Sequence, residues 1–266
     1  DISISRSNLE WGIPLPFDKN HTAYVWIEAL INYYTYGKPL KIWPADLHII
    51  GKDILWFHTI VWPAMLLAIG EELPKEIFVH GFFTIDGQKM SKTLGNVISP
   101  KDLVDKFGTD GARYLLLTAF NFGDDGDISL NKFQKKYNAD LANGLGNLVA
   151  RVSKLIEQNN LSPSRLKEDR PNQIWEEVKL ELDKFKFDSA LQYIWGTIKG
   201  VDQYLNKERP WQKELSENNQ RLSKNVILSH ALTTIIEIAE ALKPFLPETS
   251  QKILEQFKGP KIKSQK

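Results

Sequence analysis

The pattern of apolar residues changes near residue 130, and this change limits the folds that the chain can adopt. Upstream, short apolar and β-branched runs occupy residues 23–27, 47–51 and 77–83. Such runs are typical of strands that a parallel sheet buries on both faces. An apolar segment of helical length at residues 53–69 separates the second run from the third, which predicts a β-α-β unit. The first part is therefore expected to be an α/β fold built on a parallel sheet.

Downstream of a turn cluster at residues 123–127, we expect only helices. Amphipathic patterns predict them at residues 129–159, at 172–205 with a break near residue 187, at 217–243, and in a short segment after Pro247. Upstream of the turn cluster, a helix is predicted to begin at Pro100 with Ser99 as its cap and to stop at Gly108. The second part is therefore expected to be an all-α helical bundle.

These patterns divide the chain into residues 1–128, residues 129–258 and a basic tail at residues 259–266. The charge follows the same division. Residues 1–130 contain 11 Lys and Arg against 16 Asp and Glu, whereas residues 131–266 contain 23 against 17. A basic half suggests a polyanionic partner such as a nucleic acid, although a solvated, lysine-rich helix surface explains the same counts.

Composition argues against several other classes of protein. With 42% hydrophobic and 25% charged residues, a soluble globular chain is expected rather than a disordered one. No run of about 18 apolar residues occurs and the first six residues lack a basic-then-apolar leader, so we expect no membrane partner and a cytoplasmic location. With no cysteine and five scattered histidines, we expect no metal site in this chain.

Residues 86–96, the lysine loop, carry the strongest chemical signal. The loop follows a predicted strand, contains two glycines, and places Ser91 between Lys89 and Lys92. Two ammonium groups and a hydroxyl on one turn can bind phosphate oxygens. Taken by composition alone, a charged surface turn is the simpler interpretation.

The string Lys89-Met90-Ser91-Lys92-Thr93 resembles the KMSKS loop of class I aminoacyl-tRNA synthetases, with Thr93 in place of the final serine. In that family the lysines hold the triphosphate of ATP while the amino-acid carboxylate attacks the α-phosphate. Such displacements depend mainly on positioning and on preplaced positive charge. The resemblance therefore implies that Lys89, Lys92 and Ser91 are catalytic and that ATP is used as its Mg²⁺ complex.

Further blocks resemble methionyl-tRNA synthetase in particular. They are residues 23–29, 51–66, 79–82, 138–151 and 209–211. The resemblance implies a partial Rossmann-like nucleotide-binding fold followed by a helical anticodon-binding domain. It also implies a methionine–tRNA ligase, which activates methionine with ATP and transfers it to tRNA(Met).

The resemblance implies a methionine pocket formed by aromatic and small residues. Its members are Trp26, Ala29, Tyr33, Ile54, His58 and Trp62. Aromatic rings suit a thioether, because sulfur against ring edges gains roughly 0.3–1.5 kcal/mol per contact. Without the family, core packing is the more common explanation for a tryptophan such as Trp26 and for His58. Leu30 departs from the pattern, since many family members have a proline there.

For ATP, the resemblance implies that Gly51 admits the ribose and that Asp53 accepts its hydroxyls, in addition to the contacts of Lys89 and Lys92. His80 is expected near the adenine or the phosphates, with structural packing as the alternative. Arg6 lies at the spacing of an arginine that faces the reaction centre in the family, but it can also be an exposed cation.

In the helical part, Asn143, Asn147 and Arg151 recur at i, i+4 and i+8 and share one helix stripe, with Leu141, Leu145, Leu148 and Val152 on the opposite side. The resemblance implies that this stripe reads the anticodon of tRNA(Met). Trp211, after the helix-ending Pro210, would stack on the first anticodon base. A solvated polar helix face is the alternative.

The His-x-Gly-His signature that class I synthetases carry does not occur in this sequence. His48-Ile49-Ile50-Gly51 resembles it superficially, but we reject this match because the segment lies in a predicted strand. We therefore expect the chain to correspond to the C-terminal part of the enzyme, to need the N-terminal catalytic half in cis or in trans, and to be poorly active alone. A truncated chain, a split enzyme and an incomplete gene stay open as explanations. Two alternatives also remain: a class I synthetase for leucine, isoleucine or valine, and a non-catalytic tRNA-binding fragment.

Overall fold

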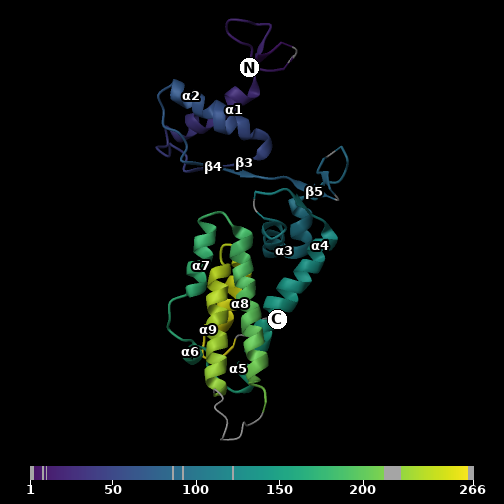
Figure 1. Ribbon diagram of the computed structural model, residues 1–266, viewed down its shortest axis with the longest axis vertical. Helices are drawn as coiled ribbons and strands as arrows, with labels where there is room; N and C mark the ends of the chain where they lie inside the picture. The colour runs from purple at the N-terminus through teal and green to yellow at the C-terminus, as the bar shows by residue number, and fades with distance from the viewer. Residues whose placement is uncertain are drawn as a thin grey trace. The chain divides into compact units, whose positions relative to one another are not determined.

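The computed structural model describes residues 3–7, 9, 11–85, 87–91, 93–121, 123–212 and 223–262. The chain folds as two units, Asp1–Phe82 and Phe83–Lys266, and each is described by itself (Figure 1). By packing, the lysine loop thus belongs with the helices. The predicted division into functional domains at 128/129 rested on the change from strands to helices, and it stays a prediction.

A β-α-β unit forms the centre of the first unit, as the sequence predicts. Strand β3 (Leu47–Gly51) pairs in parallel with β4 (Glu76–His80) along its whole length. The connection begins with the short 3-10 helix η1 (Lys52–Ile54), continues through the π-helical turn η2 (Phe57–Val61) and ends with α2 (Trp62–Ala68). The end of β3 and the start of the connection therefore lie together, which is where ligands bind in open α/β sheets.

The strand predicted at residues 23–27 is wrong. Only β2 (Thr22–Ala23) is extended there, paired antiparallel with β1 (Ser5–Arg6), and helix α1 (Val25–Gly37) follows at once. The apolar stripe of α1 packs on η2 and α2 through Ile27, Leu30, Tyr34, Val61, Trp62 and Leu66. Burial of a stripe with helical spacing outweighed the β-propensity of the short run.

In the second unit, the lysine loop is attached to a small three-stranded sheet. Its order is β6 (Gln88–Lys89), β5 (Phe83–Ile85) and β7 (Gly126–Asp127); β5 is antiparallel to β6 and parallel to β7. The run predicted as one strand at residues 77–83 is therefore divided between β4 and β5. Strand β7 lies inside the predicted turn cluster, because two residues are too few to show a period.

Helix α3 (Pro100–Leu117) begins as predicted. Ser99 and Asp102 form a capping box in which each side chain accepts the other's backbone N–H. The predicted interruption is also present, because Gly108 adopts a left-handed conformation with φ 71°. The chain resumes its helical course immediately afterwards.

The rest of the second unit is a helical bundle, as predicted. It contains α4 (Leu130–Lys136), the π-helix η3 (Tyr137–Gly146), α5 (Asn147–Gln158), α6 (Pro163–Leu166), α7 (Gln173–Leu182), α8 (Phe187–Glu208), α9 (Lys224–Leu242) and α10 (Pro247–Phe257). Helix α9 is long and apolar enough to cross a membrane, but 72% of that stretch is buried among its neighbours. Its composition therefore suits a core helix. The start of the helix predicted at residues 217–243 lies partly outside the described residues.

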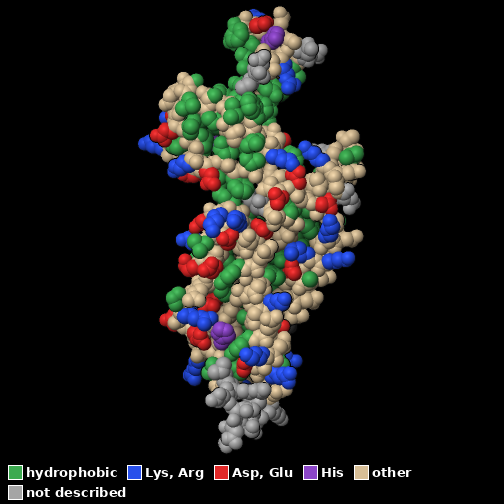
Figure 2. Space-filling view, viewed as in Figure 1, with side chains coloured by type: hydrophobic (Ala, Val, Ile, Leu, Met, Phe, Trp, Pro, Cys, Tyr) green, Lys and Arg blue, Asp and Glu red, His purple; other side chains and the backbone are tan. Residues whose placement is uncertain are grey.

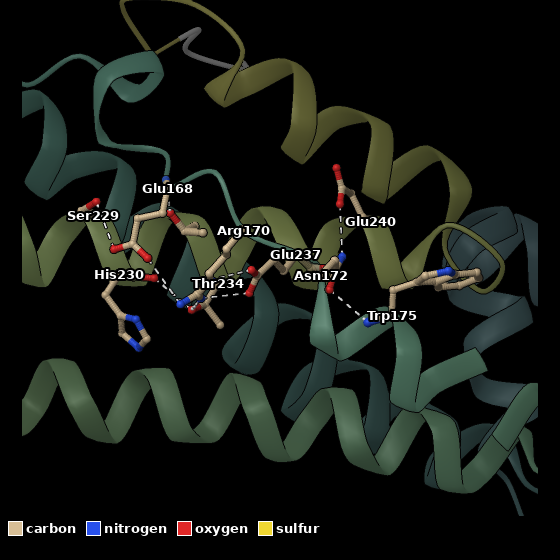
Figure 3. A network of polar contacts seen from close by, with 10 residues as sticks. Glu168, Arg170, Asn172, Trp175, Ser229, His230, Thr234, Glu237 and Glu240 are labelled. Carbon is tan, nitrogen blue, oxygen red and sulfur yellow. Dashed lines mark hydrogen bonds and ion pairs between the residues drawn. The ribbon is translucent and has the colours of Figure 1, made fainter. Parts of the chain in front are cut away.

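A polar network pins the segment between α6 and α7 to α9 (Figure 3). Glu237 on α9 accepts hydrogen bonds from Arg170 Nε at 2.8 Å and Nη2 at 3.1 Å. The backbone carbonyl of Glu237 and the carboxylate of Glu240 both accept from Asn172, which also caps α7 through the N–H of Trp175. The core helix is thus held to the connection that crosses it.

Replacing Glu237 with glutamine is expected to lower the free energy of unfolding by about 1–2 kcal/mol. Glutamine removes the negative charge that binds Arg170. The loss is limited because the Arg170 side chain is 36% exposed, so water can solvate its guanidinium when the ion pair is gone. Urea denaturation checks this, with Glu177→Gln on the exposed face of α7 as the matched control. Equal midpoints for the two variants would contradict it.

Candidate functional site

An aromatic wall forms where α1 meets η2. The rings of Trp26 and Phe57 stack with centroids 4.8 Å apart and planes 16° apart, and the His58 ring meets Trp26 edge to face with centroids 6.4 Å apart. Tyr33, two helical turns after Trp26, contacts the His58 ring at 5.7 Å. Ala29 lies between them on the same stripe and is half-buried. The structure therefore brings together residues that the sequence placed in one pocket.

Hydrogen bonds fix the proton positions in this wall. His58 Nδ1 lies 3.0 Å from the carbonyl oxygen of Ile54, which can only accept, so Nδ1 carries a proton. In the neutral ring Nε2 is then the acceptor, and the Tyr33 hydroxyl, 3.1 Å away, donates to it. The Tyr33 oxygen can therefore still accept a hydrogen bond from a ligand, but its hydroxyl hydrogen already bonds to His58. Ile54 thus contributes to the wall through its backbone carbonyl.

Two further aromatic residues back the wall. Trp62 is 1% exposed and its ring lies 6.0 Å from Tyr33, so it supports the pocket from behind. His48 is 6% exposed, 4.5 Å from the Tyr33 ring and 5.9 Å from His58. Burial, followed by repulsion from His58, lowers the pKa of His48, so this imidazole stays neutral at pH 7.

Sequence reasoning missed Phe57 and His48. Phe57 precedes His58 in the quoted block, but only the π-helical turn brings its ring face onto Trp26. His48 stood in a predicted strand, and alternation along β3 was the signal that its side chain points to the covered face. Leu30, the departure from the family pattern, is 1% exposed and packs in the core beneath this wall.

The end of β3 forms a small cradle of polar groups. A side chain added to Gly51 would place its Cβ 2.7 Å from Asp53 Oδ1 and 3.7 Å from His80 Cε1. Gly51 has ordinary extended backbone angles, so its conformation does not require glycine, and any larger side chain would have to displace the exposed Asp53 carboxylate. His80 pairs with Gly51 across the sheet, and its Nδ1 donates to the Gly81 carbonyl at 2.9 Å. The three residues expected to contact ATP from this unit therefore lie together.

Arg6 lies on β1 with its side chain exposed. Its guanidinium is 4.6 Å from the centre of the Tyr24 ring, the residue that precedes α1. A cation over an aromatic face is attracted by the ring and is held in a defined direction. The Arg6 guanidinium therefore contacts the N-cap residue of α1, the helix that carries Trp26.

The lysine loop of the second unit is shaped by side-chain bonds to its backbone. Ser91 Oγ accepts from the N–H of Thr93 at 3.2 Å, and Asn96 Oδ1 accepts from the N–H of Ser91 at 2.8 Å. Lys89 is exposed at the end of β6. Lys92 lies outside the described residues, so the predicted pair of lysines is placed only at its first member.

The predicted polar stripe of the bundle is exposed on one side and backed by core on the other. Asn143 on η3 and Asn147 on α5 are exposed, whereas Leu145, Leu148 and Val152 are at most 3% exposed. The half-buried Leu141 packs against the same core. The helical period predicted this division correctly.

Arg151 supports Trp211 rather than pointing freely outward. Its guanidinium lies 4.5 Å from the centre of the Trp211 ring, and Nη1 and Nη2 each donate at 2.7 Å to Asp202 and Asn206 of α8. Arg209 ends α8 in a left-handed conformation, which turns the chain so that Trp211 meets α5. Sequence reasoning missed the two α8 residues, although their i, i+4 spacing marks one helix face.

Comparison with known proteins identifies the family. Residues 1–153 match the family model described as tRNA synthetases class I (M). The methionine–tRNA ligase of Clostridium acetobutylicum is 43% identical over 275 residues, which cover 97% of this chain and 42% of that protein. That of Thermotoga maritima is 38% identical, with 96% and 43% covered. The chain therefore spans less than half the length of these curated relatives.

Solved structures agree. Mycobacterium tuberculosis methionyl-tRNA synthetase in complex with methionyl-adenylate is similar with a TM-score of 0.82 and 34% identity, over 96% of this chain and 54% of that chain. The free form of the same enzyme gives 0.76 and 31%. These likenesses confirm the partial Rossmann-like fold followed by helices. Because the family model covers more than half of its residues, the chain belongs to the class I tRNA synthetases of the methionyl type.

Proposed function

We propose that this chain is the lysine-loop part of a methionine–tRNA ligase that acts in cytoplasmic protein biosynthesis. In the proposed reaction, a carboxylate oxygen of methionine attacks the α-phosphorus of Mg²⁺-ATP, the bond to the β-phosphate breaks, and pyrophosphate leaves. The methionyl group of the adenylate then passes to tRNA(Met), and AMP is released. The observation that carries the proposal is that the connection from β3 to α2 supplies residues to both sites: Phe57 and His58 to the aromatic wall, and Asp53 to the Gly51 cradle.

The wall suits the side chain of methionine. Trp26 and His58 present ring edges and faces to a thioether, and Ala29 leaves room between Trp26 and Tyr33. Trp62 supports the wall from the core, and we propose that the half-buried Ile54 side chain closes one side of the pocket. The Tyr33 hydroxyl already donates a hydrogen bond to His58. We therefore propose that this pair recognises the shape and polarisability of the methionine side chain and does not donate a hydrogen bond to its sulfur.

The cradle suits the nucleoside of ATP. Gly51 leaves space over Asp53, whose carboxylate can accept ribose hydroxyl protons, and His80 lies alongside. We propose that Lys89 and Lys92 neutralise the triphosphate, with Ser91 donating its hydroxyl proton to phosphate while its oxygen accepts from Thr93. Arg6 is proposed to face the reacting groups.

We propose that the chain corresponds to the C-terminal part of the enzyme and works with an N-terminal catalytic half, in cis or in trans. Among the described residues β3 pairs with β4 alone, whereas sheets usually have about 4–6 strands. Large apolar side chains of this unit are exposed: Ile49, Trp56, Ile60 and Leu67 are 47–66% exposed. Hydrophobic side chains are also prominent on the face of this unit that Figure 2 shows. A further layer with the His-x-Gly-His signature would cover them and complete the ATP site.

In the second unit, we propose that Asn143, Asn147, Arg151 and Trp211 bind the anticodon of tRNA(Met). Both amides are exposed, Asn143 within η3 and Asn147 at the start of α5. Trp211 is 43% exposed, so one ring face is available to a base while Arg151 supports the other.

The deciding experiment is ATP–pyrophosphate exchange by the chain combined with a matching N-terminal half. Exchange that depends on methionine, and that leucine, isoleucine and valine do not support, is the expected result. Absence of exchange in a folded mixture would refute the ligase function. Exchange that depends on leucine, isoleucine or valine instead would mean that the chain belongs to a synthetase for that amino acid. Salt-sensitive tRNA binding without exchange is the outcome for a non-catalytic fragment.

Replacing Tyr33 with phenylalanine is expected to raise the KM for methionine by about 2- to 10-fold, because one hydrogen bond is lost while the ring contacts remain. The hydroxyl positions His58, so kcat should change less than KM. Steady-state exchange kinetics measure both. Tyr36→Phe is the matched control, because Tyr36 lies on the same helix and is 71% exposed. An unchanged KM in Tyr33→Phe would contradict the role of this bond.

A further inference from the structure

The lysine loop is held by residues outside the proposed set of catalytic and binding groups. Strand β7 runs beside β5 and pairs Asp127 with Thr84. Asp127 Oδ1 accepts the backbone N–H of Gly87 at 2.9 Å and the hydroxyl of Thr84 at 3.2 Å. A carboxylate 40 residues downstream thus reaches the start of the loop.

In the described part of the loop, Gly87 and Gly95 are the residues with positive φ. Their φ angles are 74° and 66°, a region that residues with a side chain rarely adopt. An added Cβ at either would meet nothing within 4 Å, so the backbone conformation and not the available space requires glycine. Asp127 fixes the first turn through the N–H of Gly87.

Asn96 fixes the second turn. Its Oδ1 accepts the N–H of Ser91 at 2.8 Å, and its Nδ2 donates to the carbonyl of Lys89 at 3.4 Å. One side chain therefore bonds to the backbone on both sides of Met90. The segment that carries Lys89 and Ser91 is anchored at its beginning by Asp127 and at its end by Asn96.

Charge and packing adapt Asp127 to this task. The Gly87 N–H and then Lys132, whose Nζ is 2.8 Å from Oδ2, lower the pKa of Asp127, so the carboxylate stays ionised at neutral pH. Lys132 also balances its charge, so the anchor presents less repulsion to an incoming triphosphate. Figure 1 places β5 and α4, the helix that carries Lys132, at the same end of the second unit.

The glycine before Asp127 is required for the same arrangement. A Cβ on Gly126 would lie 1.6 Å from Cδ1 of Phe120, so only glycine lets this ring cover β7. The Phe120 ring also contacts Phe83 of β5 edge to face, with centroids 5.4 Å apart. Strand β7, and with it Asp127, is thereby locked against the strand that leads into the loop.

We propose that Asp127 and Asn96 are positioning residues that clamp the two ends of the lysine loop and hold its cations in the arrangement that receives the triphosphate of ATP. The catalytic consequence rests on the proposed ligase function, whereas the clamp itself does not. Both residues act through the loop backbone and neither needs to touch ATP.

The first test uses the 266-residue chain and needs no activity. In hydrogen–deuterium exchange, Asp127→Ala is expected to accelerate exchange across residues 83–97 by about 10-fold or more, since the acceptor for Gly87 is lost. Asn96→Ala should do the same around Ser91. Asp124→Ala is the matched control, because Asp124 lies on the same turn and accepts a side-chain bond from Asn121. If residues 83–97 exchange hydrogen at the wild-type rate in both Asp127→Ala and Asn96→Ala, the clamp is overturned.

The second test uses the assembled enzyme. Asp127→Ala and Asn96→Ala are expected to raise the KM for ATP by about 10-fold and leave the KM for methionine unchanged. Asp127→Asn keeps one acceptor and should fall in between, while Lys132→Met should have the smallest effect. Equal changes in both KM values would mean a merely structural role and would overturn the proposal.

The outcomes separate the two proposals. If the wild-type assembly shows no methionine-dependent exchange, the ligase function fails, and hydrogen exchange alone decides the clamp. If Asp127→Ala does not fold, Asp127→Asn and Asn96→Ala decide the clamp through the same two measurements. Wild-type loop exchange in both of these folded variants would refute the clamp.

Discussion

Replacing Lys89 with alanine is expected to reduce methionine-dependent ATP–pyrophosphate exchange about 100- to 1,000-fold in the assembled enzyme. The lysine stands at the end of β6, where the clamped loop presents it to solvent. Charge that develops on the leaving pyrophosphate is stabilised by preplaced cations, and alanine leaves that charge without this partner. The loss should appear mainly in kcat, because the cation acts most strongly in the transition state.

Lys101→Ala is the matched control for this experiment. Lys101 is an exposed lysine on α3 that pairs with Asp105 of the same helix, so its removal changes the net charge equally. The rate of ATP–pyrophosphate exchange by Lys101→Ala should stay close to that of the wild-type protein. A loss of less than about 3-fold in Lys89→Ala, corresponding to under 1 kcal/mol, would exclude a direct role for this lysine.

Replacing Trp211 with alanine is expected to weaken binding of a tRNA(Met) anticodon stem-loop about 5- to 150-fold, because stacking on one base contributes roughly 1–3 kcal/mol. Arg151 holds the ring in place, so little ordering is needed when a base arrives. The loss should be smaller for stem-loops whose anticodon is not CAU, since these gain less from the site. Fluorescence titration at fixed salt measures it.

Trp211→Phe is the matched variant, because phenylalanine keeps an aromatic face and should retain most of the affinity. Tyr193→Ala, which removes an exposed aromatic ring from the same unit, serves as the second control. Equal binding by Trp211→Ala and the wild-type chain for the CAU stem-loop would refute the anticodon role.

Long elements were predictable and very short ones were not. The whole of β3 and the interruption at Gly108 follow from run length, apolar pattern and a glycine signal. Strands β1, β2, β6 and β7 have two residues each, too few to show a period, so their pairing depends on neighbours that are distant in sequence. The run at residues 23–27 shows the opposite error, because burial against α2 turned an apparent strand into α1.

For the candidate site, the sequence by itself determined which residue types are available and in what order, including the lysine loop, the Trp26 and His58 blocks and the polar stripe of α5. Only the tertiary structure decided which groups meet. It set His58 between Ile54 and Tyr33, Arg151 beneath Trp211, and Asp127 against Gly87. The physical reason is that local patterns depend on the chain's own period, whereas hydrogen bonds and ring contacts depend on distances between segments that only packing brings together.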